Sequence, residues 1–153
     1  MTAKIIQFDV DTQWNSTYNM LGDALRCKTE LVRLVRAYPD MLASYTLTAD
    51  DWSFVDQLHT VLKPFNEFTK LVSFGRPTIT TTTRIYFGLS NHLKLAGACK
   101  DKYVEYDHVI TNAVHGSLEL FNKYYNTMDQ NLIYYIALVL DLQIKGVWIQ
   151  REH

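Results

Sequence analysis

Asp9 and Asp11 are the first residues whose type and spacing could support chemistry, because paired carboxylates can hold a divalent metal ion. A two-metal site needs at least three oxygen-bearing side chains that converge from different elements. Asp9 and Asp11 stand two positions apart on one short segment, so their spacing favours helix capping or solvation, as it does for Asp50-Asp51. A metal-dependent nuclease that uses Asp9, Asp11 and Asp141 is kept as an alternative to be tested.

The histidines and cysteines do not have the spacing of a metal centre. His108 and His115 are seven residues apart on one expected helix, which offers no third ligand, and Cys99 lies outside that helix. The sequence also lacks a G-x-S-x-G nucleophile motif and a G-x-x-x-x-G-K-[ST] phosphate loop. We therefore predict no metal site and no catalytic residue in the chain. Cys27 and Cys99 form no C-x-x-C pair, so free thiols in a reducing, intracellular compartment are expected.

The composition is that of a folded domain without a basic excess. The chain has 153 residues, 15 basic and 16 acidic side chains, and a net charge of −1. Its length fits one domain or a piece of a larger protein, and 48% apolar residues can fill a core, which excludes intrinsic disorder as the main state. The balanced charge requires any nucleic-acid role to be local or shared with a partner. No stretch approaches the ~20 apolar residues of a membrane span, so no membrane partner is expected.

Apolar spacing predicts that the chain is mostly helical after a short first segment. Residues 4–10 alternate loosely between apolar and polar side chains and are interpreted as one short strand. A long amphipathic helix is expected from Ser16 onward, with Asn15 or Ser16 as its N-cap and Pro39 just past its end.

A second helix is expected to begin at Thr48, whose hydroxyl can cap the turn that contains Asp51. Pro64 lies within the apolar stripe of this helix and predicts a kink or a break. Two more helices are expected over residues 78–95 and 106–125, with Ile79, Ile85, Tyr86, Leu89 and Leu93 pointing inward from the first of these. The short apolar segment 132–140 fits a strand as well as a helix by its length, and the helices before it favour a helix. The predicted fold is mainly α, a single helical domain of about five helices with at most one short N-terminal strand.

An unusual string of residues gives the sequence a family resemblance. Residues 9–21 read D-V-D-T-Q-W-N-S-T-Y-N-M-L, which resembles the D-V-x-T-R-W-N-S-T-Y-x-M-L block of the hAT-superfamily (hobo/Activator-type) transposases. Four further blocks resemble that family and follow in its order, so that the resemblance covers about residues 9–145. They are Asp51-Trp52; Leu62-Lys63-Pro64-Phe65 with Thr69, Ser73 and Pro77-Thr78-Ile79; Lys123-Tyr124-Tyr125; and Ile136-Ala137-Leu138-Val139-Leu140-Asp141 with Lys145.

The resemblance implies a helical region that is inserted into an RNase-H-like transposase core. In that family three acidic residues hold two divalent metal ions, Mg or Mn, and the insertion lies between the second and third acids. Both acids and the BED-type zinc finger are expected outside this sequence. The chain is thus expected to be a fragment or degenerate copy that holds no cofactor and does not cut DNA alone. Residues 1–14 would form an N-terminal extended segment, 15–145 the helical insertion domain, and 146–153 a C-terminal tail.

The resemblance also implies a nuclear protein whose partners are transposon-end DNA and other transposase subunits or a second copy of itself. Trp14 looks like the residue that stacks on a base displaced from the duplex near the cleaved end; the alternative is a buried tryptophan that anchors the helix. Gln13 replaces the arginine of the family and removes a positive charge. The predicted DNA-contacting residues are Trp14, Gln13, Asn15, Lys63, Lys70, Arg76 and Arg84. The last four would form a local basic strip; the alternative, which is favoured, is that they are solvated surface charges.

A second function is consistent with the same residues. The near-zero net charge, Gln13, and the absence of a core that would cover the insertion favour a domesticated or fragmentary helical protein-interaction module that does not bind DNA. Binding of a branched or hairpin DNA end by the native protein, and its loss in Trp14→Ala, would distinguish the two functions.

Overall fold

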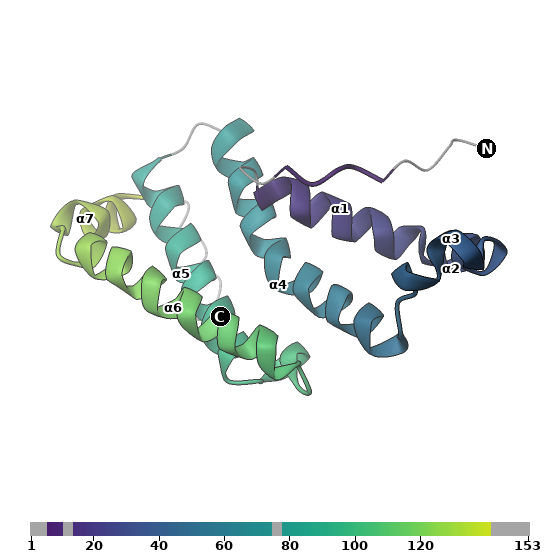
Figure 1. Ribbon diagram of the computed structural model, residues 1–153. Helices are drawn as coiled ribbons and strands as arrows, with labels where there is room; N and C mark the ends of the chain where they lie inside the picture. Colours follow the sequence, from purple (N-terminus) through teal and green to yellow (C-terminus); the bar gives the residue numbers. More distant parts are fainter. Residues whose placement is uncertain (1–5, 11–13, 75–77, 142–153) are drawn as a thin grey trace, which may run out of the picture. The chain divides into compact units, whose positions relative to one another are not determined.

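Helices make up most of the computed structural model, which describes residues 6–10, 14–74 and 78–141 (Figure 1). These ranges contain seven α-helices, two short 3-10 helices and no strand, so the predicted mainly α fold is confirmed. The α-helices outnumber the predicted five because the first expected helix is divided and a short extra helix follows it. In chain order the elements are α1 (Trp14–Arg26), α2 (Lys28–Ala37), α3 (Pro39–Leu42), η1 (Ala43–Tyr45), α4 (Ala49–Phe74), α5 (Ile79–Gly97), η2 (Asp101–Tyr103), α6 (His108–Asp129) and α7 (Leu132–Leu140).

The chain is divided into two compact units, residues 1–66 and 67–153, and the division falls inside α4. The first unit contains α1 to η1 and most of α4, and the second contains the end of α4 and the elements from α5 to α7. The predicted limits of the insertion domain, 15–145, stay a prediction, and residues 142–153 lie outside the described part of the chain.

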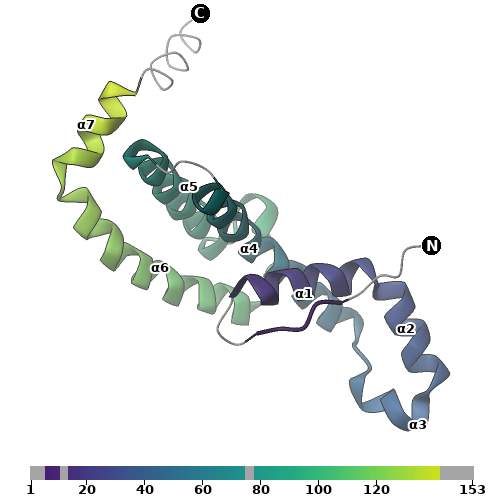
Figure 2. The same ribbon diagram turned by 90° about the horizontal axis from the view of Figure 1, so that it is seen from above.

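Residues 6–10 run beside α1 and do not form the predicted strand (Figure 2). A lone strand would leave its backbone groups without partners. In this segment two of the N–H groups bond to side chains of α1: Gln7 N–H donates to Asp23 Oδ2 at 3.1 Å, and Val10 N–H donates to Ser16 Oγ at 2.7 Å.

The first predicted helix is divided at Cys27, where the chain changes direction between α1 and α2 (Figure 2). Cys27 has φ −98° and ψ 11°, away from regular helical values, and its side chain is buried. Backbone hydrogen bonds continue on both sides, from Cys27 N–H to the Asp23 carbonyl and from Leu31 N–H to the Cys27 carbonyl. Because apolar spacing also continues through Cys27, periodicity could not reveal this corner.

The predicted N-cap of the first helix is wrong. α1 begins at Trp14, so Asn15 and Ser16 both lie in its first turn. Ser16 Oγ bonds to the preceding segment and does not cap the helix. Pro39 does stand past the end of α2, as the first residue of α3, where its missing N–H costs no intrahelical bond.

The N-terminus of α4 has the predicted capping box. Asp51 N–H donates to Thr48 Oγ1 at 3.1 Å, and the Thr48 N–H and hydroxyl donate to Asp51 Oδ2 at 2.8 and 2.7 Å. These bonds from Thr48 lower the pKa of Asp51. α4 continues through Pro64, so the helix does not break there, and the kink, which is the other predicted outcome, stays a prediction. Val61 and Asn66 on either side of Pro64 are buried, and we attribute the continuity to their packing.

In the second unit α5 packs against α6 and α7 and also contacts η2 (Figure 1). α7 is a helix, as predicted, and Asn131 caps it by accepting the Ile133 N–H at 3.2 Å. Ile85 and Leu93 are buried as predicted, whereas Tyr86 and Leu89 are half-buried. The buried apolar side chains of this unit are Ile85, Leu93, Ala96, Tyr103, Ile110, Val114 and Met128.

At the start of α5, the buried face of the helix carries threonines, and Ile79 does not lie on it. Ile79 is exposed, contrary to prediction, while Thr80 and Thr83 are buried. Thr83 Oγ1 donates to the Ile79 carbonyl at 2.9 Å, and Thr80 Oγ1 donates to the Ala137 carbonyl of α7 at 3.3 Å. Because carbonyl oxygens satisfy both hydroxyls, these threonines can be buried in a helix at low cost.

Tyr103 holds the connection between α5 and α6. Its buried hydroxyl lies 2.5 Å from His92 Nδ1, and burial raises the pKa of Tyr103, which keeps the phenol protonated. Cys99, Asp101 and Glu105 in this connection have φ values of 48°, 58° and 67°, a region that is unfavourable for residues other than glycine. The Tyr103–His92 contact therefore anchors a connection that carries backbone strain.

Candidate nucleic-acid interface

Asp9 ties the segment before α1 to the first turn of that helix. Its Oδ1 accepts hydrogen bonds from Ser16 Oγ at 2.6 Å, from Thr17 Oγ1 at 2.9 Å and from the Val10 N–H at 2.9 Å. These bonds, that from Ser16 first, lower the pKa of Asp9. The network fixes the chain on both sides of residues 11–13, at Val10 and at the start of α1. Asp9 thus lies at the entry to α1, as predicted, but among the described residues its partners are two side-chain hydroxyls and the Val10 N–H and include no backbone N–H of the helix.

Asp23, which lies farther along α1 than Ser16 and Thr17, holds the same segment at Gln7. Its Oδ2 accepts the Gln7 N–H at 3.1 Å, and its Oδ1 is paired with the Arg26 guanidinium. The bond from Gln7 and then the bond from Arg26 lower the pKa of Asp23. Two carboxylates, one on the segment and one on the helix, therefore keep residues 7–10 against α1.

α1 is in turn positioned against α4 by an aromatic stack within the first unit. The rings of Tyr18 and His59 stack with centroids 4.4 Å apart and an interplanar angle of 11°. A Cβ atom at Gly22 would lie 2.9 Å from His59 Nε2, so a larger residue here would force the imidazole to shift. Burial lowers the pKa of His59, helped by Lys63 and opposed by Asp56.

Acidification is expected to destabilise the first unit through His59. In the unfolded chain a histidine titrates near pH 6.5, and the pKa of His59 in the folded state is lower. The unfolded state therefore binds the proton first, and the free energy of unfolding falls as the pH drops below about 6.5 towards the folded pKa. Melting temperatures of the native protein and His59→Gln at about pH 7.5 and 5.5 test this. The native protein should lose more stability than the variant; equal losses would contradict the prediction.

The predicted DNA-contacting set is only partly within the described residues. Gln13, Arg76 and the side chain of Trp14 lie outside them, although Trp14 is the first residue of α1. Asn15 is half-buried, and its Oδ1 is buried without a hydrogen-bond partner.

The three described cations of the predicted basic strip, Lys63, Lys70 and Arg84, are all exposed. Lys63 belongs to the first unit, whereas Lys70 and Arg84 belong to the second. The basic strip stays a prediction.

The described residues do not fit a catalytic metal site. No three His, Cys, Asp or Glu side chains among them come together as metal ligands. Asp9 is occupied by Ser16 and Thr17, and Asp11 lies outside the described ranges. His108 and His115 are both exposed on α6.

Comparison with known proteins identifies the relatives of this chain. Residues 1–61 match the family described as the ZBED1 RNase-like helical domain. The chain is also 30% identical to an AC transposase of Zea mays, over 97% of this chain and 18% of that protein. The chain is a helical region related to the hAT-type transposases. The resemblance inferred from the sequence blocks is thereby confirmed.

Two further relatives of this chain carry other names. The zinc finger BED domain-containing protein DAYSLEEPER of Arabidopsis thaliana is 32% identical over 94% of this chain and 19% of its own length. The transcriptional regulator tpeD of Talaromyces stipitatus is 35% identical over 72% of this chain and 12% of its own length. The chain thus spans a fifth or less of the curated relatives it matches. No solved structure matches it.

None of the described helices is both long and apolar enough to cross a membrane.

Sequence reasoning missed contacts that position α1. The Asp9 network joins residues seven and eight positions apart, and the sequence predicted a position at the helix entry for Asp9 but not its bonds to the Ser16 and Thr17 hydroxyls. The Gln7–Asp23 bond joins residues 16 positions apart, and the Tyr18–His59 stack joins different helices. Such pairings leave no periodic signal in one sequence.

Proposed function

We propose that this chain is the DNA-end-binding helical insertion region of a hAT-type transposase. The observation that carries the proposal is its similarity, over almost its whole length, to an AC transposase and to a BED zinc finger protein. A transposase acts on DNA ends, and the third relative is named as a transcriptional regulator. We place the protein in the nucleus on the same basis.

Trp14 is the proposed contact to DNA. It stands at the N-terminus of α1, next to a segment that Asp9 and Asp23 hold in place. A base that leaves the duplex loses a few kcal/mol of stacking and pairing, and stacking on an indole can restore about 1–3 kcal/mol. A helix whose first turn is held by hydrogen bonds suits this role because less of the backbone needs to be ordered upon binding.

The chemistry of transposition is proposed to lie outside this sequence. The carboxylates that would hold Mg or Mn in the complete enzyme are expected elsewhere, and this chain would hold no metal of its own. Its part would be to bind and orient the transposon end, together with other transposase subunits. The alternative nuclease would show metal-dependent nicking that Asp11→Asn abolishes.

Trp14→Ala is expected to weaken binding to a branched or hairpin-bearing DNA end about tenfold, the equivalent of one lost stacked base. Fluorescence anisotropy over a salt series measures the dissociation constants of the native protein and the variant. Phe8→Ala is the matched control, because Phe8 is a nearby aromatic residue that is 92% exposed. Equally weak binding by the native protein and Trp14→Ala would contradict the DNA role.

One observation favours the second candidate, a protein-interaction module without DNA binding. The helix α7 is almost entirely apolar, and six of its side chains are exposed: Leu132, Ile133, Tyr135, Ile136, Val139 and Leu140. Exposed apolar surface of this kind marks contact with other protein. Failure to bind any DNA end, combined with concentration-dependent self-association in sedimentation, would favour this function.

A further inference from the structure

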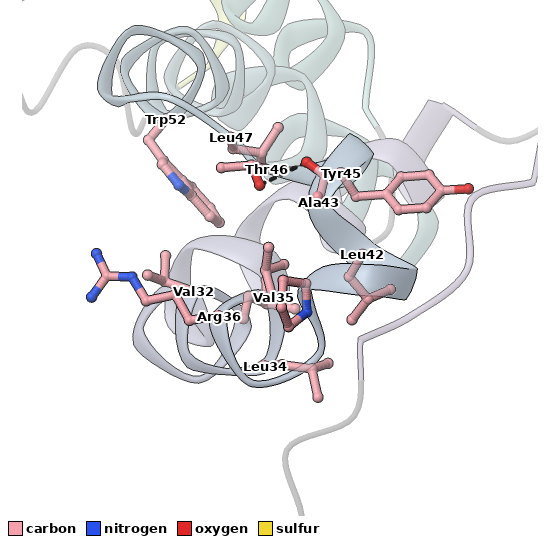
Figure 3. A pocket seen from close by; sticks show the side chains of 12 residues that line it. Val32, Leu34, Val35, Arg36, Leu42, Ala43, Tyr45, Thr46, Leu47 and Trp52 are labelled. Carbon is pink, nitrogen blue, oxygen red and sulfur yellow. Dashed lines mark hydrogen bonds between the residues drawn. The ribbon is translucent and has the colours of Figure 1, made fainter.

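An apolar pocket lies between α2, α3, η1 and the start of α4 in the first unit (Figure 3). Its volume is about 610 Å³, within the range of pockets that bind ligands or anchor side chains. The walls are mostly aliphatic, with Val32, Val35 and Leu42 on one side and Leu47 and Trp52 on the other. A pocket of this size in a small helical unit leaves apolar surface that a partner can cover.

The indole of Trp52 supplies an unsatisfied hydrogen-bond donor at the pocket. Trp52 is 6% exposed, lines the pocket, and its Nε1 is buried without a hydrogen-bond partner. Figure 3 shows the indole reaching from α4 into the space between Leu47 and Val32. Buried N–H groups are rarely left unpaired, and a Trp N–H can only donate. A ligand that presents an oxygen acceptor would complete it.

The charges at the pocket are positive. Arg36 is the charged residue among those that line it, and the Lys28 ammonium lies 5.1 Å from the centre of the Trp52 ring. Asp51, beside Trp52 in the sequence, is bonded to Thr48 in the capping box, and the exposed Glu30 and Asp40, beside the lining residues Leu31 and Pro39, are not part of the lining. The ligand that fits is therefore apolar with an acidic group at its edge.

Apolar surface continues beyond the mouth of the pocket. Leu34, Tyr45 and Leu47 line the pocket and remain exposed, and Tyr38 and Met41 are exposed on the same short stretch of chain. A small molecule that filled the pocket would cover less of the exposed surface of Leu34, Tyr45 and Leu47 than an amphipathic helix laid across it.

We propose that this pocket receives a large apolar side chain from an acidic amphipathic helix of a partner protein. Carboxylates of that helix would pair with Arg36 and Lys28, and one of its oxygens would accept from Trp52 Nε1. The site does not depend on the proposed DNA role, because it uses neither Trp14 nor the predicted basic strip.

Calorimetric titration of the full chain with three synthetic acidic helical peptides tests this proposal. The peptides carry Leu, Phe or Trp at one anchor position and Leu one turn away, with Glu elsewhere; a fourth carries Ala at both positions. At least one anchored peptide should bind, and the Ala peptide should bind about tenfold more weakly or not at all, because anchors dominate such interfaces. No binding by any anchored peptide, or equal binding by the Ala peptide, would overturn the proposal.

Charge reversal on α2 supplies a matched pair of variants. Arg36→Glu should weaken peptide binding about tenfold, whereas Arg33→Glu, an exposed arginine outside the pocket lining, should change it less than about threefold. Trp52→Phe, which keeps a ring but lacks the N–H, should weaken binding about fivefold while circular dichroism stays native. Equal weakening by both charge reversals would indicate unspecific attraction and contradict the site. Binding of an aryl carboxylate, but of no peptide, would replace the partner helix by a small ligand.

Discussion

Trp52→Ala is expected to lower the free energy of unfolding by about 3–5 kcal/mol, the range for the loss of a large buried aromatic side chain. Trp52 is 6% exposed and closes one side of the apolar pocket against α2, so its removal joins a new void to an existing one. The Lys28 ammonium over its ring would also lose its partner. Urea unfolding followed by circular dichroism measures the change.

Two variants sharpen this test. Phe8→Ala removes an aromatic ring that is almost fully exposed and should cost less than about 0.5 kcal/mol. Trp52→Phe should cost much less than Trp52→Ala, because it keeps most of the apolar volume and removes the unpaired Nε1 donor. A native-like stability of Trp52→Ala would mean that the indole is not part of the core of the first unit.

Leu93→Ala is expected to lower the free energy of unfolding by about 2–5 kcal/mol through the second unit. Leu93 is 2% exposed on α5, the helix that packs against α6, α7 and η2. It follows His92, whose Nδ1 bonds Tyr103, so a cavity at this point also loosens support for the strained connection to α6. Thermal and urea unfolding by circular dichroism give the loss.

Leu120→Ala provides the same chemical change at an exposed site. Leu120 lies on α6 with 58% of its surface exposed, and its truncation should change stability by less than about 0.5 kcal/mol. If Leu93→Ala and Leu120→Ala lowered the free energy of unfolding by similar amounts, the result would contradict the burial of Leu93 between α5 and its neighbours in the second unit.

Much of the fold could be predicted because the signals were local. The capping box of Thr48 and Asp51 lies within four residues, and it marks the start of α4 in the structure. The helical nature of α5 and α6 followed from apolar spacing, that of α7 from the helices before it, and α7 ends at Leu140 as predicted. Helix caps and amphipathic helices are determined by residues that are close in the sequence, so they can be predicted from a single sequence.

The errors arose where tertiary packing overrides local pattern. The corner at Cys27 keeps its hydrogen bonds and its apolar spacing, so no local signal marks it. Thr80 and Thr83 are buried because the Ala137 and Ile79 carbonyls accept their hydroxyls, and one of these partners lies in another helix. From the sequence alone, a helix face with polar residues is predicted to be exposed, because the carbonyl groups that accept their hydrogen bonds are not known.

The candidate site shows the same division. The position of Asp9 at the entry to α1 was accessible from the sequence, and the family blocks indicated the relationship that the comparisons confirm. The stack of Tyr18 on His59 and the Trp52 pocket depend on how helices meet, which periodicity does not specify. The role of Trp14 in DNA binding stays a prediction.

The most direct measurement combines Trp14→Ala with an abasic nucleotide beside the transposon end in a double-mutant cycle of DNA-binding affinities. If Trp14 stacks on the displaced base, each change alone should weaken binding about tenfold, and the two together should weaken it hardly further. If the two effects were simply additive, or if neither change altered the dissociation constant, Trp14 would not be the residue that holds the displaced base.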